Sequence, residues 1–180
     1  MNKKYLLVVF TLAAILLATP IVSAAIPNRG QNKKQLVDYK SDGYLGDSLY
    51  TTTVEYPYVY FVGYRPQESI LEYSMTINGE EYSYPEDFSY AETFTLTYHI
   101  PTETLILDVV CVFTFNLPGN PTITEHISSE GISEGVYSGS FVLDGTKMFN
   151  KVMGGGTESA FEEEDILHAI HEGQIMGWPF

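Results

Sequence analysis

The sequence predicts an all-β fold: a single antiparallel β-barrel, or a β-sandwich, of about nine or ten strands. Apolar and polar residues alternate with a period of two along much of the chain, and no window keeps a 3.6-residue period. Turn-forming residues separate these stretches at short, regular intervals. Hydrophobic residues make up 44% of the 180-residue chain and charged residues 18%, which suits one packed domain.

The first 24 residues have the pattern of a secretory signal peptide. Residues 2–4 give a positively charged start, and an apolar run from Tyr5 to Ala18 follows. That run is too short to span a bilayer comfortably as a helix. Pro20 breaks it, and Val22 and Ala24 are small residues that a signal peptidase accepts. We therefore expect cleavage after Ala24 and a secreted or extracytoplasmic protein with no stable membrane insertion; a retained membrane anchor is the alternative.

The rest of the chain divides into a short arm and one domain. Residues 25–35 hold proline, glycine and three basic residues, which is typical of a flexible arm. Residues 36–180 contain no linker that would split them, so we expect a single all-β domain. Its expected strands are 48–55, 58–64, 70–77, 80–84, 93–100, 105–115, 123–127, 136–144, 149–153 and about 166–178.

Turn chemistry supports the first strands of this series. Pro57 separates 48–55 from 58–64. Asn78-Gly79 separates 70–77 from 80–84, and this dipeptide tolerates the positive φ angles of a type I′ turn. The sequence therefore predicts a two-residue hairpin at Asn78-Gly79.

Alternation is clearest in the middle of the chain. Residues 93–100 place threonines on one face and large apolar residues on the other. In 105–115 one face is wholly apolar and includes Cys111, so we expect a buried thiol with a raised pKa rather than a nucleophile. The other face mixes valines with Asp108 and Thr114, which indicates cover on both sides. Residues 118–121 end the strand with turn residues.

The pattern of residues 135–158 is similar to that of a hairpin in known proteins. A strand leads to Gly145, followed by Phe149, Val152 and the run Gly154–Gly156. This pattern resembles the hairpin of dirigent and allene-oxide-cyclase-like proteins, which are barrels of the calycin type, and of secreted prokaryotic proteins of unknown function. The resemblance implies a barrel in which Gly145 opens a turn, Phe149 and Val152 pack inward, and the glycine run bends the strand. No catalytic or binding motif of these families matches this chain.

Composition excludes several classes of function. The chain has 9 Lys and Arg against 23 Asp and Glu, a net charge of -14. Nucleic acids and anionic membranes both require a basic face, so neither is an expected partner. The single cysteine excludes an intrachain disulfide and a multi-cysteine zinc site. An acidic surface keeps the protein soluble and attracts cations.

The C-terminal segment holds the best candidate for metal binding. If residues 163–171 were a helix, His168 and His171 would share a face, with Glu164 and Glu172 a turn either side. If about 166–178 is a strand, the two histidines point to opposite faces and the site is lost. Gly173, Gly177 and Pro179 favour the strand, because all three are poor helix residues. The acids from Glu162 to Asp165 favour a short helix, because they would complement a helix N-terminus.

A second acidic set offers hard oxygen ligands. Asp38, Asp42 and Asp47 surround the turn-forming Gly43, which is chemistry that can hold calcium, although the spacing matches no known calcium loop. A divalent cation therefore remains an alternative to the expectation of no cofactor.

A row of tyrosines is the candidate ligand-binding feature. Tyr56, Tyr58, Tyr60 and Tyr64 share one strand face at a period of two. If exposed, they form a flat surface for sugar rings or a partner protein; if buried, they are core. Tyr82 and Tyr84 repeat the spacing on the next hairpin.

The function that follows is a secreted, acidic, non-catalytic binding domain. No Gly-x-Ser-x-Gly elbow, phosphate-binding loop or HExxH motif is present. The expected partner is a small apolar ligand, a glycan or a surface protein. A secreted metal-assisted enzyme using the His168/His171 region and a calcium-bridged cell-envelope protein are the alternatives.

Overall fold

The computed structural model describes residues 35–132, 136–147 and 150–178. These ranges hold eleven strands and one 3-10 turn, and the all-β prediction is confirmed. The expected signal segment and all of the arm but its last residue lie outside the described residues. The elements are β1 (Leu36–Leu45), β2 (Leu49–Glu55), β3 (Tyr58–Arg65), η1 (Gln67–Ser69), β4 (Ile70–Ile77), β5 (Glu80–Ser83), β6 (Phe88–His99), β7 (Thr104–Phe115), β8 (Thr122–Ile132), β9 (Val136–Lys147), β10 (Asn150–Glu163) and β11 (Ile166–Met176).

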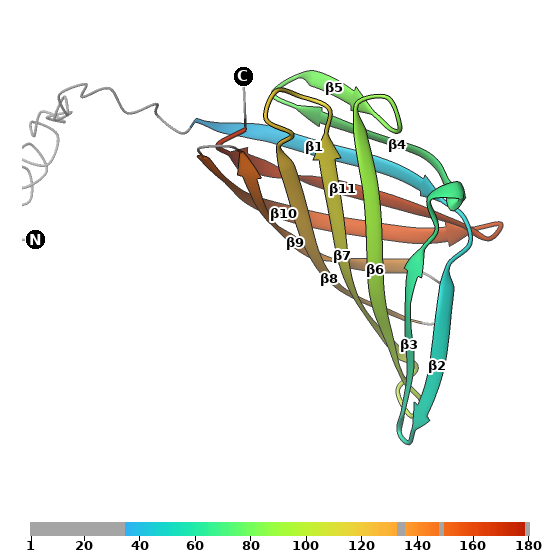
Figure 1. Cartoon of the computed structure of the whole chain (residues 1–180). Coiled ribbons are helices and arrows are strands. Elements are labelled where there is room, and N and C mark those ends of the chain that lie inside the picture. Colours follow the sequence, from blue (N-terminus) through green and yellow to red (C-terminus); the bar gives the residue numbers. More distant parts are fainter. Residues whose placement is uncertain (1–34, 133–135, 148–149, 179–180) are drawn as a thin grey trace, which may run out of the picture. The chain divides into compact units, whose positions relative to one another are not determined.

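All eleven strands belong to one antiparallel sheet. Its order is β2-β3-β6-β7-β8-β9-β10-β11-β1-β4-β5, so β2 and β5 are its two ends. The sheet curls into a half-barrel in which β1, β4 and β5 run across the upper ends of β6, β7 and β8 (Figure 1). Of the two predicted architectures, the structure therefore has the curled single sheet and not two stacked sheets.

Three local expectations need correction. The strand β1 was not predicted, because Ser41 and Gly43 occupy inward positions where alternation would place apolar residues. The strand β10 extends far beyond the expected 149–153. Gly145 does not open a turn; it lies inside β9, paired with Ile123 on one side and Val152 on the other.

The glycine run Gly154–Gly156 lets three strands approach closely. It sits in the middle of β10, with β9 on one side and β11 on the other. A Cβ on Gly156 would collide with the carbonyl oxygen of Glu172 in β11. The expected bending role of this run therefore takes the form of tight backbone packing inside a continuous strand.

Aromatic side chains fill the interior of the half-barrel. Tyr73 of β4 lies 6.2 Å from Phe88, 5.2 Å from Tyr90 and 5.4 Å from Phe113, between ring centroids. Because β4 and β6 are far apart in the strand order, these contacts cross the interior. They hold the two arms of the curled sheet together, and the edge-to-face geometry of the Tyr73–Phe88 pair adds to the energy of burial.

A second aromatic group closes one end. Tyr82 of β5 and Trp178 both pack on Phe115 of β7, at centroid distances of 5.4 and 4.5 Å. Tyr82 is buried and Tyr84 packs against the same core. These two tyrosines are therefore core residues and not an exposed surface.

Cys111 provides a direct test of which strand face points inward. Its side chain is 2% exposed, which confirms its expected burial, and its Sγ lies 3.5 Å from the Tyr90 hydroxyl. Burial, followed by the carboxylates of Glu92 and Glu125, raises the pKa of the thiol well above its ordinary value.

We expect Cys111 to react slowly with a thiol reagent in the folded protein and rapidly in denaturant, measured by mass spectrometry. Rapid labelling of the folded protein would show that the strand faces are reversed.

Candidate functional site

The inner face of the sheet buries an unusual set of polar side chains. Burying a charge is costly unless a partner compensates it, so each of these groups requires an account of its contacts. We refer to the set as the inner polar cluster. It consists of Ser41, Arg65, Glu92, Glu125, Ser129, Glu158 and His171.

Glu125 and His171 form the centre of the cluster. The Glu125 Oε2 atom lies 2.9 Å from His171 Nδ1, and Tyr39 donates its hydroxyl hydrogen to Glu125 Oε1. Ser41 Oγ lies 3.0 Å from the same Nδ1 and 3.3 Å from the Tyr73 hydroxyl. These residues come from β1, β4, β8 and β11, so the network crosses the interior.

Electrostatics favour the ionised pair. Burial is the largest single effect and opposes the cationic form of His171, but Glu125, together with the carboxylates of Glu158 and Glu92, outweighs burial and raises the pKa of His171 above its ordinary value. Burial and the same carboxylate raise the pKa of Tyr39 well above its ordinary value, so Tyr39 remains a neutral donor. The centre is therefore a buried ion pair of Glu125 and His171, and Tyr39 donates a hydrogen bond to its carboxylate.

Ser41, His171 and Glu125 are the residue types of a catalytic triad but do not have its geometry. In a triad the serine and the acid contact different ring nitrogens of the histidine, so that one nitrogen removes the proton while the other is held. Here both partners lie against Nδ1. All three side chains are also buried. The arrangement fits structural pairing and not nucleophilic catalysis.

A second buried ion pair joins Arg65 of β3 to Glu92 of β6, and Arg65 also contacts the chain after β1. Arg65 Nε lies 3.3 and 3.2 Å from the two carboxylate oxygens of Glu92, and Tyr90 donates to the same carboxylate. Arg65 Nη1 also donates to the carbonyl oxygen of Gly46. The guanidinium therefore joins the β3 end of the sheet to the loop that follows β1.

Glu158 is the third carboxylate of the cluster. It lies directly opposite His171 in the β10–β11 ladder, and Gly139 of β9 separates it from Ser129. A Cβ on Gly139 would meet Ser129, so this glycine opens space between the two polar side chains. Glu158 Oε2 has no hydrogen-bond partner among the described residues. Burial raises the pKa of Glu158, against the opposing effects of His171 and Ser129.

The interior spaces beside this cluster are small. One cavity of about 30 Å³ is bounded by Glu158, His171 and Cys111, and a neighbouring one of about 80 Å³ by Arg65 and Glu162. Pockets for drug-sized ligands measure roughly 300–1,000 Å³. Neither cavity is large enough for the small apolar ligand that a barrel suggests.

The structure does not bring the predicted metal ligands together. Residues 166–176 are a strand, as predicted, and the helix alternative is wrong. Strand parity turns His171 inward and His168 outward, where His168 lies between Tyr44 and Phe161. Among the described residues no group of three His, Cys, Asp or Glu side chains is placed to hold a metal ion.

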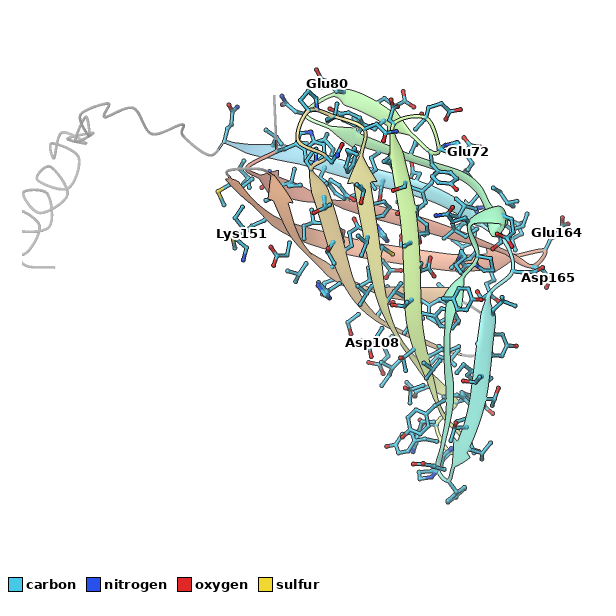
Figure 2. The ribbon with its side chains drawn as sticks, viewed as in Figure 1. Glu72, Glu80, Asp108, Lys151, Glu164 and Asp165 are labelled. Carbon is cyan, nitrogen blue, oxygen red and sulfur yellow. The ribbon has the colours of Figure 1, made fainter. Side chains whose placement is uncertain are left out.

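The two glutamates of that set lie elsewhere. Glu172 faces outward and pairs with Lys40 Nζ at 2.8 Å. Glu164 has a positive φ of 51° at the tip of the β10–β11 turn, next to Asp165 (Figure 2). Neither lies beside His171, because each occupies the opposite face or the end of the strand.

The acidic set around Gly43 is also dispersed. Asp38 and Asp42 lie on the exposed outer face of β1, with Lys40 between them. Asp38 and Asp42 are four positions apart along the strand, a distance of about 13 Å. Asp47 follows the strand and is exposed.

The predicted tyrosine row lies on the outer face of the sheet. Tyr58, Tyr60 and Tyr64 share that face of β3, opposite His99, Thr97 and Thr93 of β6. Tyr56 lies in the turn before β3 and is exposed. The shared face is therefore as expected, and a role in binding stays a prediction.

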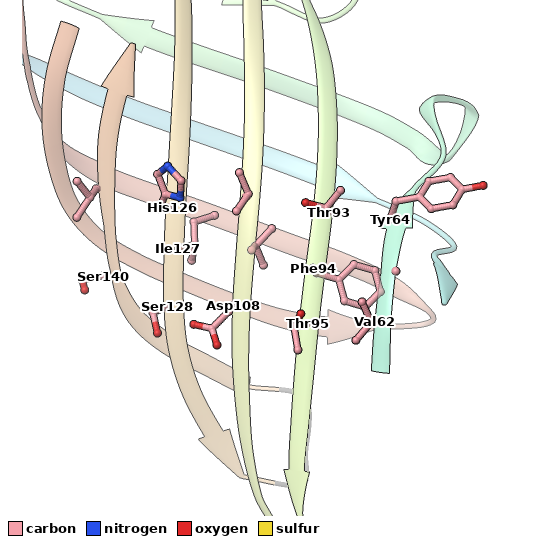
Figure 3. A pocket seen from close by; sticks show the side chains of 14 residues that line it. Val62, Tyr64, Thr93, Phe94, Thr95, Asp108, His126, Ile127, Ser128 and Ser140 are labelled. Carbon is pink, nitrogen blue, oxygen red and sulfur yellow. The ribbon is translucent and has the colours of Figure 1, made fainter. Parts of the chain in front are cut away.

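A groove on this outer face is the candidate site. Strand register aligns residues of β3, β6, β7, β8 and β9 into two parallel rows across the sheet (Figure 3). The groove measures about 720 Å³, a volume within the range of ligand sites. The first row is Tyr64, Thr93, Val110, His126 and Val142, and the second is Val62, Thr95, Asp108, Ser128 and Ser140.

The two rows combine an apolar surface with polar groups. Valines from three strands and the ring of Tyr64 supply apolar surface, while Asp108, His126 and Ser128 supply donors and acceptors in the middle. Sequence reasoning did not find His126 or the serines, because they join the site only through the register of two hairpins. Asp108 on a valine-rich face was the one available signal.

Comparison with protein-family models, with curated proteins and with solved structures finds no match to this chain. The resemblance of residues 135–158 to dirigent and allene-oxide-cyclase-like barrels therefore stays a prediction. Within the described ranges, no helix is long and apolar enough to cross a membrane.

The inner polar cluster predicts a pH dependence of stability. His171 and Glu158 both have raised pKa values, so the folded chain binds their protons more tightly than the unfolded chain. The His171 contribution is complete below the ordinary pKa of histidine, about 6.5, and is lost as pH rises through the raised pKa. The contribution of protonated Glu158 to stability is complete below the ordinary pKa of a glutamate and is lost as pH rises through its raised pKa. We expect the melting temperature to fall as the pH rises above about 6.5, the ordinary pKa of histidine.

Glu158→Gln isolates one part of this effect. It should be more stable than the wild type at neutral pH and less dependent on pH, because no buried carboxylate has to ionise. Glu130→Gln, at an exposed position of β8, is the control and should leave the melting curve unchanged. A Glu158→Gln protein that melts below the wild type at neutral pH would show that the ionised Glu158 carboxylate does not destabilise the fold.

Proposed function

We propose that this protein is a secreted binding protein that holds a neutral glycan in the outer-face groove without catalysing a reaction. The observation that carries the proposal is the contrast between the two faces. The groove is wide and accessible, whereas the charged and nucleophilic residue types of the inner face are buried, and four of them form the ion pairs Arg65–Glu92 and His171–Glu125.

The chemistry of the groove suits a sugar. A pyranose ring has an apolar C–H face that packs on an aromatic ring, and hydroxyl groups that require donors and acceptors. Tyr64, which is 51% exposed, supplies the ring at one end, and Tyr60 and Tyr58 continue along the same strand face. Asp108 and His126 supply hydrogen-bonding groups toward the centre.

The width of the groove and the net charge of the chain narrow the class of ligand further. The two rows cross five strands, a width of about 19 Å at the usual strand spacing of about 4.8 Å. That width suits several linked sugar units lying across the strands. The net charge of -14 disfavours an anionic polysaccharide. A neutral oligosaccharide is therefore the class of ligand that the groove fits best.

The groove lacks the pair of acids that glycoside cleavage requires. Most glycosidases place two carboxylates on either side of the bond that breaks. The residues that line this groove include one carboxylate, Asp108. Binding without hydrolysis is accordingly the simpler function, and export through the segment before Ala25 would deliver the protein to extracellular glycans.

Binding of soluble neutral oligosaccharides tests this proposal. Isothermal titration calorimetry, guided by a glycan array, should find a ligand whose affinity falls about tenfold or more in Tyr64→Ala, because a stacking surface is lost, and similarly in Asp108→Ala. Tyr44→Ala and Asp42→Ala are matched controls, since both residues are exposed on the outer face of β1, outside the groove.

The other expected partners are separate outcomes of the same experiment. Binding of an apolar small molecule, or of a surface protein, with no oligosaccharide bound would overturn the glycan assignment. An oligosaccharide that binds equally to the wild type and to Tyr64→Ala would move the site away from the groove.

A further inference from the structure

Among the residues that the structure describes, the edge strand β2 has a strand partner on one side only. It pairs with β3 along its whole length, from Leu49 opposite Tyr64 to Glu55 opposite Tyr58. It stands at the end of the strand order, and all seven of its residues are exposed. An exposed edge of this length carries free backbone donors and acceptors that can pair with another strand.

The two ends of the sheet are protected unequally. The edge strand β5 has only four residues and begins with Glu80 and Glu81, and short charged edges resist pairing. The edge strand β2 has seven residues, Leu49-Tyr-Thr-Thr-Thr-Val-Glu55, rich in β-branched side chains and without lysine, proline or glycine. The β2–β3 hairpin also projects from the lower end of the sheet, away from β4 and β5 (Figure 1).

We propose that β2 pairs with β2 of a second copy of this chain, antiparallel, about a two-fold axis at Thr52. The sequence is complementary to itself in this register. Thr52 faces Thr52, Thr51 faces Thr53, Tyr50 faces Val54, and Leu49 faces Glu55. Aromatic with β-branched and threonine with threonine are favourable cross-strand pairs, and no two like charges face each other.

The pairing also covers apolar surface that the monomer leaves exposed. Tyr50 and Val54 lie on the inner face of the hairpin, opposite Gly63 and Val59, and are 57% and 67% exposed. The Tyr50 ring already contacts Phe61 of β3 at a centroid distance of 5.6 Å. In the paired form Tyr50 of each copy meets Val54 of the other, which extends this apolar group across the axis.

Charge sets a condition on the association. The net charge of -14 on each copy repels the second copy at long range. Salt screens such repulsion over roughly 10 Å at 0.1 M. The dimer should therefore become tighter as salt concentration rises.

A two-fold axis perpendicular to the sheet places both outer faces on the same side. Two grooves would then face one surface, and a bivalent molecule binds a repeating ligand more tightly than a single groove does. This last consequence rests on the proposed function, whereas the pairing itself does not.

Cysteine cross-linking tests the axis directly. In an antiparallel pair, facing Cα atoms lie about 4.5–5.5 Å apart, within the range that a disulfide spans. Thr52→Cys should therefore form a covalent dimer under mild oxidation, seen on a non-reducing gel. Thr93→Cys is the matched control: it is exposed but lies between β3 and β7, so it should stay monomeric. Cys111 is buried and should not cross-link.

Sedimentation of the purified protein provides the second measurement. The wild type should sediment as a dimer at micromolar concentration, and Thr52→Lys as a monomer, because two ammonium groups would face each other at the axis. Thr93→Lys should sediment like the wild type. A monomeric wild type, a dimer that survives Thr52→Lys, or a Thr52→Cys protein that fails to cross-link would each overturn the proposal, whatever the outcome of the glycan experiments.

Discussion

The curl of this sheet depends on charged side chains that find partners across its interior. Glu125 of β8 and His171 of β11 are separated by two whole strands, β9 and β10, and still approach to 2.9 Å. Such a contact exists only in a strongly curled sheet, and an unpaired charge in that interior would cost several kcal/mol. Arg65 pairs with Glu92 on the neighbouring strand β6 and adds a second contact across the interior through the carbonyl of Gly46. Pairing of buried charges and the aromatic core therefore select the same curvature.

This use of the inner face leaves the outer face available for the binding that we propose. The inner side chains are buried, and the cavities between them are smaller than a drug-sized ligand. On the outer face, the same register that closes the core aligns exposed valines, threonines, serines, Asp108 and His126 into two rows. In this proposal, strand parity separates the residues that stabilise the fold from those that bind the ligand, since neighbouring residues point to opposite faces.

Period-two alternation was sufficient to predict the fold class and the burial of Cys111. It also showed that His168 and His171 would be separated if their segment were a strand. The Asn78-Gly79 dipeptide predicted the hairpin, which the pairing of Ile77 with Glu80 and the positive φ angles of both turn residues confirm. Alternation failed at β1, where Ser41 faces inward because His171 and Tyr73 provide its partners.

The contacts that define the candidate sites depend on long-range register. The pairing of Glu125 with His171 joins residues 46 positions apart in sequence, and the groove requires five strands in alignment. No local pattern specifies either. The tyrosine row was visible because all of its members lie on one strand face or in the turn before it, whereas His126 was not.

A double-mutant cycle on Glu125 and His171 tests most directly whether pairing across the interior holds the fold. The measurement is the free energy of unfolding of Glu125→Gln, His171→Leu and the double variant at pH 6. Each single change should cost about 3–5 kcal/mol, because it breaks the buried pair and leaves one partner unmatched. The double variant should cost clearly less than the sum of the two. Additive costs would show that the two residues act independently and would contradict the account.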